Sequence, residues 1–268
     1  AQESVPEGFV IETVATGLSE PIALAFTPDG ELLIGQRGGT IRVVVDDALL
    51  PEPFAELEVL TLGEGGLLGL AVANDFATNR FVYAFATVSD DEQQIIRLRD
   101  ADGVGVERTV IRGGLPTTGS VHNGGGLRMG PDGMLYFAIG DTGDPELSQQ
   151  MHTFAGKVCR ITPDGEVPTD NPFTTPTGAP RAVYALGFRN PFRFCFDPAG
   201  RLFVGDVGSS GDTRREEIND VMAGGNYGWP LVEGFGDPTT DPALRDPLIA
   251  YVEEGSSIAG CTAYHAVS

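Results

Sequence analysis

The chain has 268 residues, of which 41% are apolar and 21% charged, as in a folded globular protein rather than a disordered or fibrous one. Asp and Glu number 38 against 17 Lys and Arg, a net charge of −21, so no basic surface for nucleic acid is expected. We interpret the acidity as a solubility or high-salt adaptation, or a genome-composition bias. The apolar runs are shorter than the roughly 20 residues of a membrane helix, which predicts no membrane span.

A strand, turn, strand pattern recurs at residues 25–35, 127–136 and 196–206, with a degenerate copy at 74–85. The first two copies contain Pro-Asp-Gly, which places proline at the second position of a turn and glycine where φ is positive. Each copy therefore predicts a β-hairpin. Repeated small antiparallel units predict a radial array of sheets.

We accordingly predict an all-β fold of four-stranded antiparallel blades with minimal helix. Residues 215–222 are compatible with a short helix or a polar strand, and residues 9–14 with an N-terminal strand. The predicted blades cover residues 18–62, 63–118, 119–182 and 183–223, and a fifth begins at 224.

The cysteines are Cys159, Cys195 and Cys261, an odd number without CxxC spacing, so a zinc cluster is not expected. Each lies in an apolar run, where a buried thiol is the default, and a Cys159–Cys195 disulfide is the alternative in an oxidising compartment. The chain starts Ala-Gln-Glu, like a mature end left after signal cleavage, so we expect a secreted or periplasmic protein.

His122 precedes a Gly-Gly-Gly run that leads into a predicted strand, and that strand returns at Asp141. The hairpin brings Asp141 near His122, and a carboxylate beside an imidazole fixes its tautomer and raises its basicity, as a general base requires. A lone histidine in a turn is, however, more often a structural hydrogen-bonding residue. His152 and His265 have no comparable setting.

Arg189 precedes Asn190-Pro191, which ends an element abruptly because proline restricts the residue before it. Such a fixed arginine can bind paired oxygens of an anionic ligand, or pair with one of the many carboxylates.

The glycine-rich loop 205–212, with carboxylates at 216–217 nearby, offers oxygen ligands suited to calcium, although the spacing is not that of an EF-hand. Tyr227 and Trp229 are either flat surfaces for a planar ligand or a sugar ring, or core residues.

In their order along the chain, these motifs resemble the soluble quinoprotein sugar dehydrogenases, the glucose and sorbosone dehydrogenase family. No single motif is specific to this family, but the ordered set of motifs, which covers nearly the whole chain, is specific. The segments that carry the resemblance are 63–71, 122–125 with 140–141, 156–161 with 170–173, 189–191 and 226–230. The resemblance implies a six-bladed β-propeller that carries pyrroloquinoline quinone (PQQ) and calcium at one end of its channel.

The resemblance also implies a role for each site residue. His122 would remove the proton from the sugar hydroxyl while hydride passes to the quinone, Asp141 would orient His122, and Arg189 would stabilise the reduced ring. The implied cofactor contacts are Glu64, Arg189, Asn190, Tyr227 and Trp229, and the implied calcium ligands are the carbonyls of Gly208 and Ser209. The expected function is oxidation of a sugar or related alcohol, with an external electron acceptor reoxidising PQQ.

Three departures from the family pattern matter. Val121 stands where the glucose enzymes have an acidic residue, so the sugar preference is open. The loop 206–209, with 215–218, is closer to the branch of hedgehog-interacting-protein-like propellers, some of which bind proteins. Residues 257–264 resemble the start of a late blade, so we expect residues 1–268 to form one propeller domain truncated at its C-terminal end, with about five blades.

Two other functions follow as alternatives. The altered loop favours a non-enzymatic propeller that binds a protein or glycan. A calcium-dependent lactonase-type hydrolase is a more distant possibility.

Overall fold

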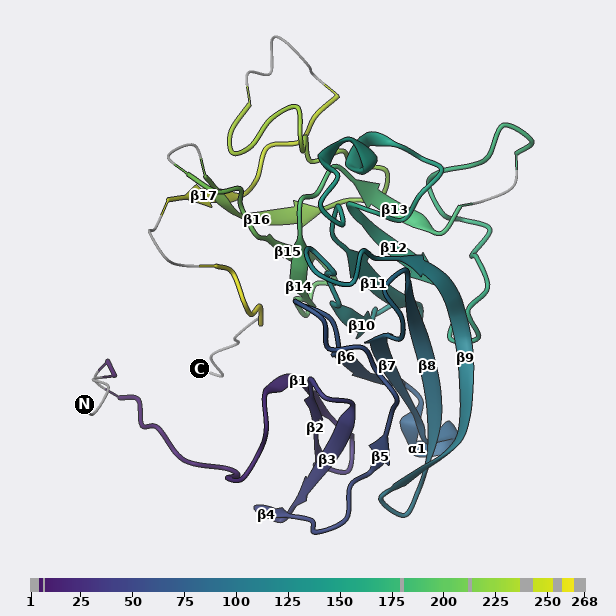
Figure 1. Ribbon diagram of the computed structural model, residues 1–268, viewed down its shortest axis with the longest axis vertical. Coiled ribbons are helices and arrows are strands. Elements are labelled where there is room, and N and C mark those ends of the chain that lie inside the picture. The colour runs from purple at the N-terminus through teal and green to yellow at the C-terminus, as the bar shows by residue number, and fades with distance from the viewer. Residues whose placement is uncertain are drawn as a thin grey trace.

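The computed structural model describes residues 5–6, 8–178, 181–211, 214–236, 243–252 and 257–262. Its strands form four antiparallel sheets in which each sheet follows the chain in order, and Figure 1 shows the sheets arranged around a common centre. The first strands of successive sheets contact one another. This is how the blades of a β-propeller are arranged.

The first sheet contains β1 (Pro21–Phe26), β2 (Leu32–Gln36), β3 (Thr40–Val45), β4 (Ala48–Leu49) and β5 (Ala55–Glu56). The second contains β6 (Leu67–Val72), β7 (Phe81–Thr87), β8 (Glu92–Ala101) and β9 (Val104–Pro116). The third contains β10 (Leu127–Met129), β11 (Leu135–Ile139), β12 (Lys157–Ile161) and β13 (Val183–Leu186). The fourth contains β14 (Pro191–Phe196), β15 (Leu202–Asp206), β16 (Glu216–Val221) and β17 (Ile249–Tyr251).

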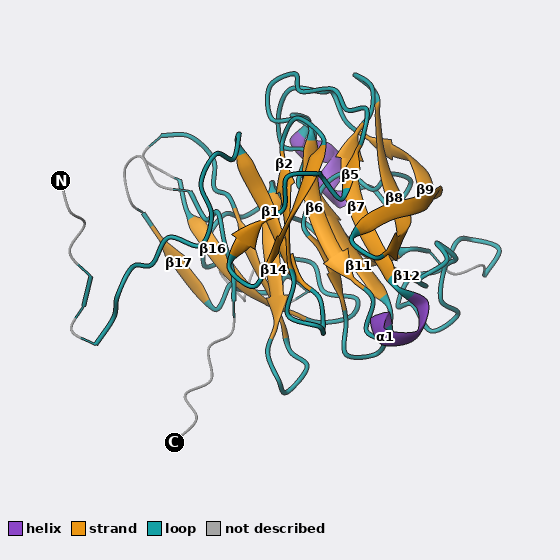
Figure 2. Cartoon of the chain, turned by 90° about the horizontal axis from the view of Figure 1, so that it is seen from below, coloured by secondary structure: helices purple, strands orange, loops and turns teal. Residues whose placement is uncertain are grey.

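Helix in the described residues is limited to α1 (Phe76–Asn79) and a 3-10 turn at Pro145–Gln149, as Figure 2 shows. The all-β prediction is therefore confirmed. No helix in this part of the chain is long and apolar enough to span a membrane.

The predicted hairpins form at all four copies of the repeat. The turns between β1 and β2, β10 and β11, and β14 and β15 each contain a glycine with positive φ, at Gly30, Gly133 and Gly200. In the degenerate copy, α1 replaces the tight turn between β6 and β7. Residues 215–222 take the strand alternative, as β16.

The prediction of about five blades, out of an implied six, was wrong, because the described residues form four. β13 closes the third sheet by pairing with β12 instead of starting the fourth. β17, expected in a fifth blade, returns to pair with β16 through Glu216↔Tyr251 and Ile218↔Ile249. The error arose because a long loop separates β17 from β16 in the sequence, so the sequence pattern did not indicate that β17 is the last strand of the fourth sheet.

The largest core cluster lies among the first three sheets, and a second cluster joins the third sheet to the fourth. In the larger cluster, Phe85 of β7 contacts Phe137 of β11, with ring centroids 6.4 Å apart. β11 is buried along its whole length, because sheets pack on both of its faces. Residues 9–14, predicted as a strand, are exposed and form none, since nothing described pairs with them.

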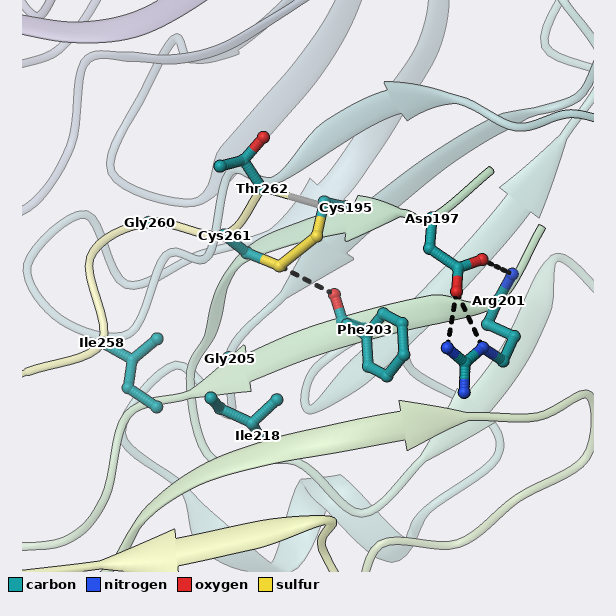
Figure 3. Close-up of a pocket in the computed structure, with 10 residues that line it drawn as sticks. All are labelled: Cys195, Asp197, Arg201, Phe203, Gly205, Ile218, Ile258, Gly260, Cys261 and Thr262. Atoms are coloured by element: carbon teal, nitrogen blue, oxygen red, sulfur yellow. Dashed lines mark hydrogen bonds and ion pairs between the residues drawn. A yellow bond between two sulfur atoms is a disulfide. The ribbon is translucent and has the colours of Figure 1, made fainter. Parts of the chain in front are cut away.

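Cys195 of β14 forms a disulfide with Cys261, with Cα atoms 5.6 Å apart, and Figure 3 shows this bridge beside a cavity of about 440 Å³. Neither predicted arrangement, three free thiols or a Cys159–Cys195 bridge, is present. Cys159 is free and buried inside the third sheet, and burial raises its pKa to about 12. Cys195 instead faces the segment 257–262, which passes over the fourth sheet. There the segment's Ile258 packs so close to Gly205 that a Cβ on the glycine would lie 2.2 Å from Ile258 Cγ2.

Candidate functional site

His122 and Asp141 are hydrogen-bonded at one end of the third sheet. His122 lies before β10 and Asp141 follows β11, so the hairpin of these strands brings them together as predicted. His122 Nδ1 is 2.5 Å from Asp141 Oδ1, and the two side chains are 17% and 1% exposed. An ionised carboxylate only accepts, so Nδ1 donates, and in the neutral imidazole Nε2 keeps a free lone pair.

Glycines allow this close approach. A Cβ on Gly140 would lie 2.2 Å from the carbonyl oxygen of His122, so only glycine fits between the two segments. Gly124, with φ +66°, donates its N–H to Asn190 Oδ1 at 3.1 Å. The glycine-rich sequence around His122 thus serves the geometry of the site.

Asp141 is held as an anion by three hydrogen bonds. Besides His122, the Gly143 N–H donates to Oδ1 at 2.8 Å and Trp229 Nε1 donates to Oδ2 at 2.9 Å. Burial alone would raise the pKa of Asp141, but these hydrogen bonds outweigh it and hold the pKa below its ordinary value. Trp229 therefore contacts the His122–Asp141 pair through its indole N–H, a role the sequence did not reveal.

Glu64 joins this site from the second sheet. Its Oε2 accepts the backbone N–H of His122 at 2.7 Å, while the rest of the side chain is exposed. Arg37 has no motif that would have singled it out, yet it holds the Glu64 loop by donating to the carbonyls of Thr61, Gly63 and Gly65 at 2.9–3.2 Å.

Arg189 and Asn190 are fixed by a buried carboxylate. Their backbone N–H groups donate to Asp206 at 2.9 and 2.6 Å. Burial, followed by the charge of Glu217, raises the pKa of Asp206 well above its ordinary value. Arg189 Nη1 donates to the Val207 carbonyl at 3.0 Å, and its guanidinium lies 5.8 Å from the Trp229 ring. Arg189 and Asn190 therefore reach the same end of the sheets as His122.

Tyr227 lies elsewhere. It is 4% exposed, stacks on Phe188 with centroids 4.9 Å apart, and donates its hydroxyl to the Asp220 carbonyl at 2.8 Å. Its ring belongs to the core, which is the structural alternative for this residue.

Gly208 and Ser209 form a tight loop against carboxylates. Ser209 donates its N–H and its hydroxyl to Glu233, both at 2.6 Å, and Gly208 donates its N–H to Glu216 at 3.3 Å. A Cβ on Gly208 would lie 2.3 Å from the Arg215 carbonyl, so the loop requires glycine. The described residues contain no group of three or more His, Cys, Asp and Glu side chains placed to hold a metal ion. Asp212 and His265 lie outside the described residues.

A cavity of about 270 Å³ adjoins this site. Glu64 lines it from the loop before β6, Asn190 and Val207 line it from one end of the fourth sheet, and residues 257–259 form one wall. The larger cavity of Figure 3 has none of the predicted site residues in its lining.

Comparison with known proteins identifies a family whose model matches this chain and several similar proteins. The family model described as glucose / sorbosone dehydrogenase matches residues 18–267. Quinoprotein glucose dehydrogenase B of Acinetobacter calcoaceticus is 32% identical over 86% of this chain and 54% of its own length. The PQQ-bound aldose sugar dehydrogenase of Streptomyces coelicolor has a TM-score of 0.84 and 36% identity, covering 94% of this chain and 74% of that one.

Human hedgehog-interacting protein is also similar, with 27% identity over 70% of this chain and 32% of its own length. The chain spans between half and two thirds of the length of the first curated relatives. The family match, which covers nearly all of the chain, and the propeller arrangement agree: the chain belongs to the glucose / sorbosone dehydrogenase family.

Proposed function

We propose that this protein oxidises a hydroxyl group of a sugar or related alcohol by hydride transfer to PQQ, with His122 as the general base. The observation that carries the proposal is the hydrogen-bonded chain from Trp229 through Asp141 to His122 Nδ1. This chain leaves His122 Nε2 free to accept a proton at the end of the sheets. Membership of a sugar dehydrogenase family supports the same reaction class.

The roles of the residues follow from their contacts. His122 Nε2 accepts the hydroxyl proton, and the Asp141 carboxylate stabilises the imidazolium that results. Because the pKa of Asp141 is lowered, this carboxylate stays ionised at neutral pH and faces the imidazole as an anion. Glu64 fixes the backbone of His122, and Asp206 fixes the backbone of Arg189 and Asn190.

A flat anionic cofactor beside His122 would contact Asn190 and Arg37. Both residues line the cavity of about 270 Å³, which is slightly below the roughly 300–1,000 Å³ of ligand pockets and does not include His122 in its lining, so the cavity would hold only part of the cofactor. When bound, PQQ would supply the hydride acceptor, and an external electron acceptor would reoxidise it. The carbonyls of Gly208 and Ser209 would be two calcium ligands, and since Ca²⁺ takes 6–8, the others would come from cofactor and water.

The test is reconstitution of the purified chain with PQQ and Ca²⁺, followed by dye reduction with a panel of aldoses. We expect activity in the wild type and a loss of about 10²–10⁴-fold in kcat for His122→Gln. Asp164→Asn, at a carboxylate that is 74% exposed on the β12–β13 connection, serves as the control and retains activity. An active wild type whose His122→Gln variant is equally active would refute the assigned base.

A non-enzymatic propeller that binds a protein or glycan is the second candidate, favoured by the similarity to hedgehog-interacting protein. Calorimetry separates the two functions. Saturable binding of PQQ at one site per chain supports the enzyme, whereas no PQQ binding by a folded chain favours the binding module.

We also propose that the protein works in an oxidising compartment, secreted or periplasmic. The Cys195–Cys261 disulfide supports this, since such bonds persist where thiols are not kept reduced. Thiol titration of the denatured, unreduced protein should find one free thiol, that of Cys159; three would contradict the proposal.

A further inference from the structure

A further cavity, of about 200 Å³, lies between the second and third sheets, away from the candidate site. Arg112 of β9 forms one side, the segment 151–154 after the 3-10 turn forms another, and residues 181–183 at the start of β13 close it. None of the residues assigned to the proposed dehydrogenase site lines this cavity, so its function is independent of that proposal.

Arg112 is a cation without a counter-ion. Its guanidinium lies over the Phe154 ring, 5.0 Å from the centroid, and its buried Nε has no hydrogen-bond partner. No described residue forms an ion pair with it. Seven of the sixteen arginines pair with carboxylates, and Arg112 is not among them: Arg37, Arg80, Arg97, Arg99, Arg160, Arg201 and Arg214.

Arg181 reinforces the positive charge of the cavity. It donates through Nη1 to the Met151 carbonyl at 2.6 Å and through Nε to the Thr174 carbonyl at 3.3 Å, which fixes its guanidinium. Within the described chain, its Nη2 forms no hydrogen bond or ion pair. His152 adds an exposed imidazole to the same lining, and no Asp or Glu belongs to it.

The cavity thus gathers two guanidinium groups and an imidazole in a chain with 38 carboxylates and a net charge of −21. A partly buried guanidinium is costly without an anionic partner, and its planar set of donors matches the two oxygens of a carboxylate. The remaining walls are mostly apolar, with Met151, Phe154 and Val183 among them, and also include Thr153 and Thr175. At about 200 Å³ the cavity is smaller than the roughly 300–1,000 Å³ of pockets for drug-sized ligands, so its size suits a molecule smaller than a nucleotide.

We propose that this cavity binds a small organic carboxylate with a compact apolar body, its carboxylate between Arg112 and Arg181 and its body against Phe154 and Val183. Arg112 is already stacked on Phe154 and Arg181 is already held by backbone carbonyls. Binding therefore requires little ordering of side chains, which lowers its entropic cost.

The test uses benzoate as the probe, titrated into the purified chain by saturation-transfer NMR at constant ionic strength. We expect saturable binding in the wild type and at least tenfold weaker binding in Arg112→Met. Arg112→Lys, which keeps the charge but loses the planar donors, should give an intermediate affinity. Arg108→Met removes the same charge from an exposed position of the same strand and should bind benzoate like the wild type.

Benzyl alcohol and inorganic phosphate, used as competitors, test separately the site for the apolar body and the site for the charge. Benzyl alcohol has the apolar body without the charge, and phosphate has the charge without the body, so both should compete poorly with benzoate. The proposal is overturned if the wild type shows no saturable binding, if Arg112→Met binds as tightly, or if either competitor equals benzoate. Should Arg112→Met not fold, as judged by circular dichroism, Arg181→Met provides the same test.

Discussion

Replacing Asp141 by asparagine tests the site most directly, because the change keeps the shape of the side chain and removes its charge. Asp141 accepts hydrogen bonds from His122 Nδ1, Gly143 N and Trp229 Nε1. An amide has one acceptor oxygen and one donor group, so it cannot accept from all three. Asp141→Asn therefore changes both the chemistry of His122 and the stability of the loop.

The size of each effect follows from this geometry. If the amide NH₂ faces His122, the imidazole must carry its proton on Nε2 and is no longer a base. If it faces Trp229, the imidazolium loses its counter-charge, which at about 4 Å and an effective dielectric constant of about 20 is worth about 4 kcal/mol, or about 10³-fold in rate. One buried donor also loses its acceptor, which costs about 1–3 kcal/mol of stability.

Dye reduction by the PQQ- and Ca²⁺-loaded protein measures the first effect, and calorimetric unfolding without cofactor measures the second. We expect kcat to fall by about 10³-fold and Tm to fall by about 2–4 °C for each kcal/mol lost. Asp164→Asn should change neither beyond a small surface effect. An Asp141→Asn variant with unchanged kcat and unchanged Tm would show that the hydrogen bonds of this carboxylate contribute neither to catalysis nor to stability, which would refute the roles given to Asp141.

Three further predictions concern other residues. Trp229→Phe removes one charge-assisted hydrogen bond to Asp141, worth about 1.5–3 kcal/mol, so the Asp141 pKa should rise, which carboxylate-detected NMR titration measures; an unchanged pKa would contradict the role given to the indole. Burial raises the pKa of Glu217 to about 7, so the folded chain binds an extra proton between about pH 4.5 and 7, and stability should fall by about 3 kcal/mol as pH rises through that window. Urea unfolding at pH 5 and pH 8 measures this change. Glu217→Gln should reduce the pH dependence, and the part that remains would come from Asp206, whose pKa burial also raises; a profile as steep in the variant as in the wild type would contradict the role given to Glu217. Cys195→Ser opens a link between residues 66 apart and should cost about 4 kcal/mol in the loop-entropy model, seen as a lower urea midpoint, whereas Cys159→Ser should leave the sensitivity to reductant unchanged.

The sequence was most informative where a local rule applies. Pro-Asp-Gly turns predicted the hairpins, because proline and glycine restrict the backbone without help from distant residues. The same hairpin argument placed Asp141 beside His122, since both residues flank one pair of strands. The pairing of segments joined by long loops was harder to predict. β17 follows such a loop, and it was assigned to a new blade although it pairs with β16.

The tertiary structure alone decided which distant groups meet. Trp229 and Asp141 are 88 residues apart, and Glu64 and His122 are 58 apart, yet each pair shares a hydrogen bond because neighbouring sheets present their loops at the same end. The partner of Cys195 and the core position of Tyr227 depended on the same packing. Backbone preferences act over a few residues and are written in the sequence, whereas contacts between sheets depend on how apolar faces pack, which no single segment encodes.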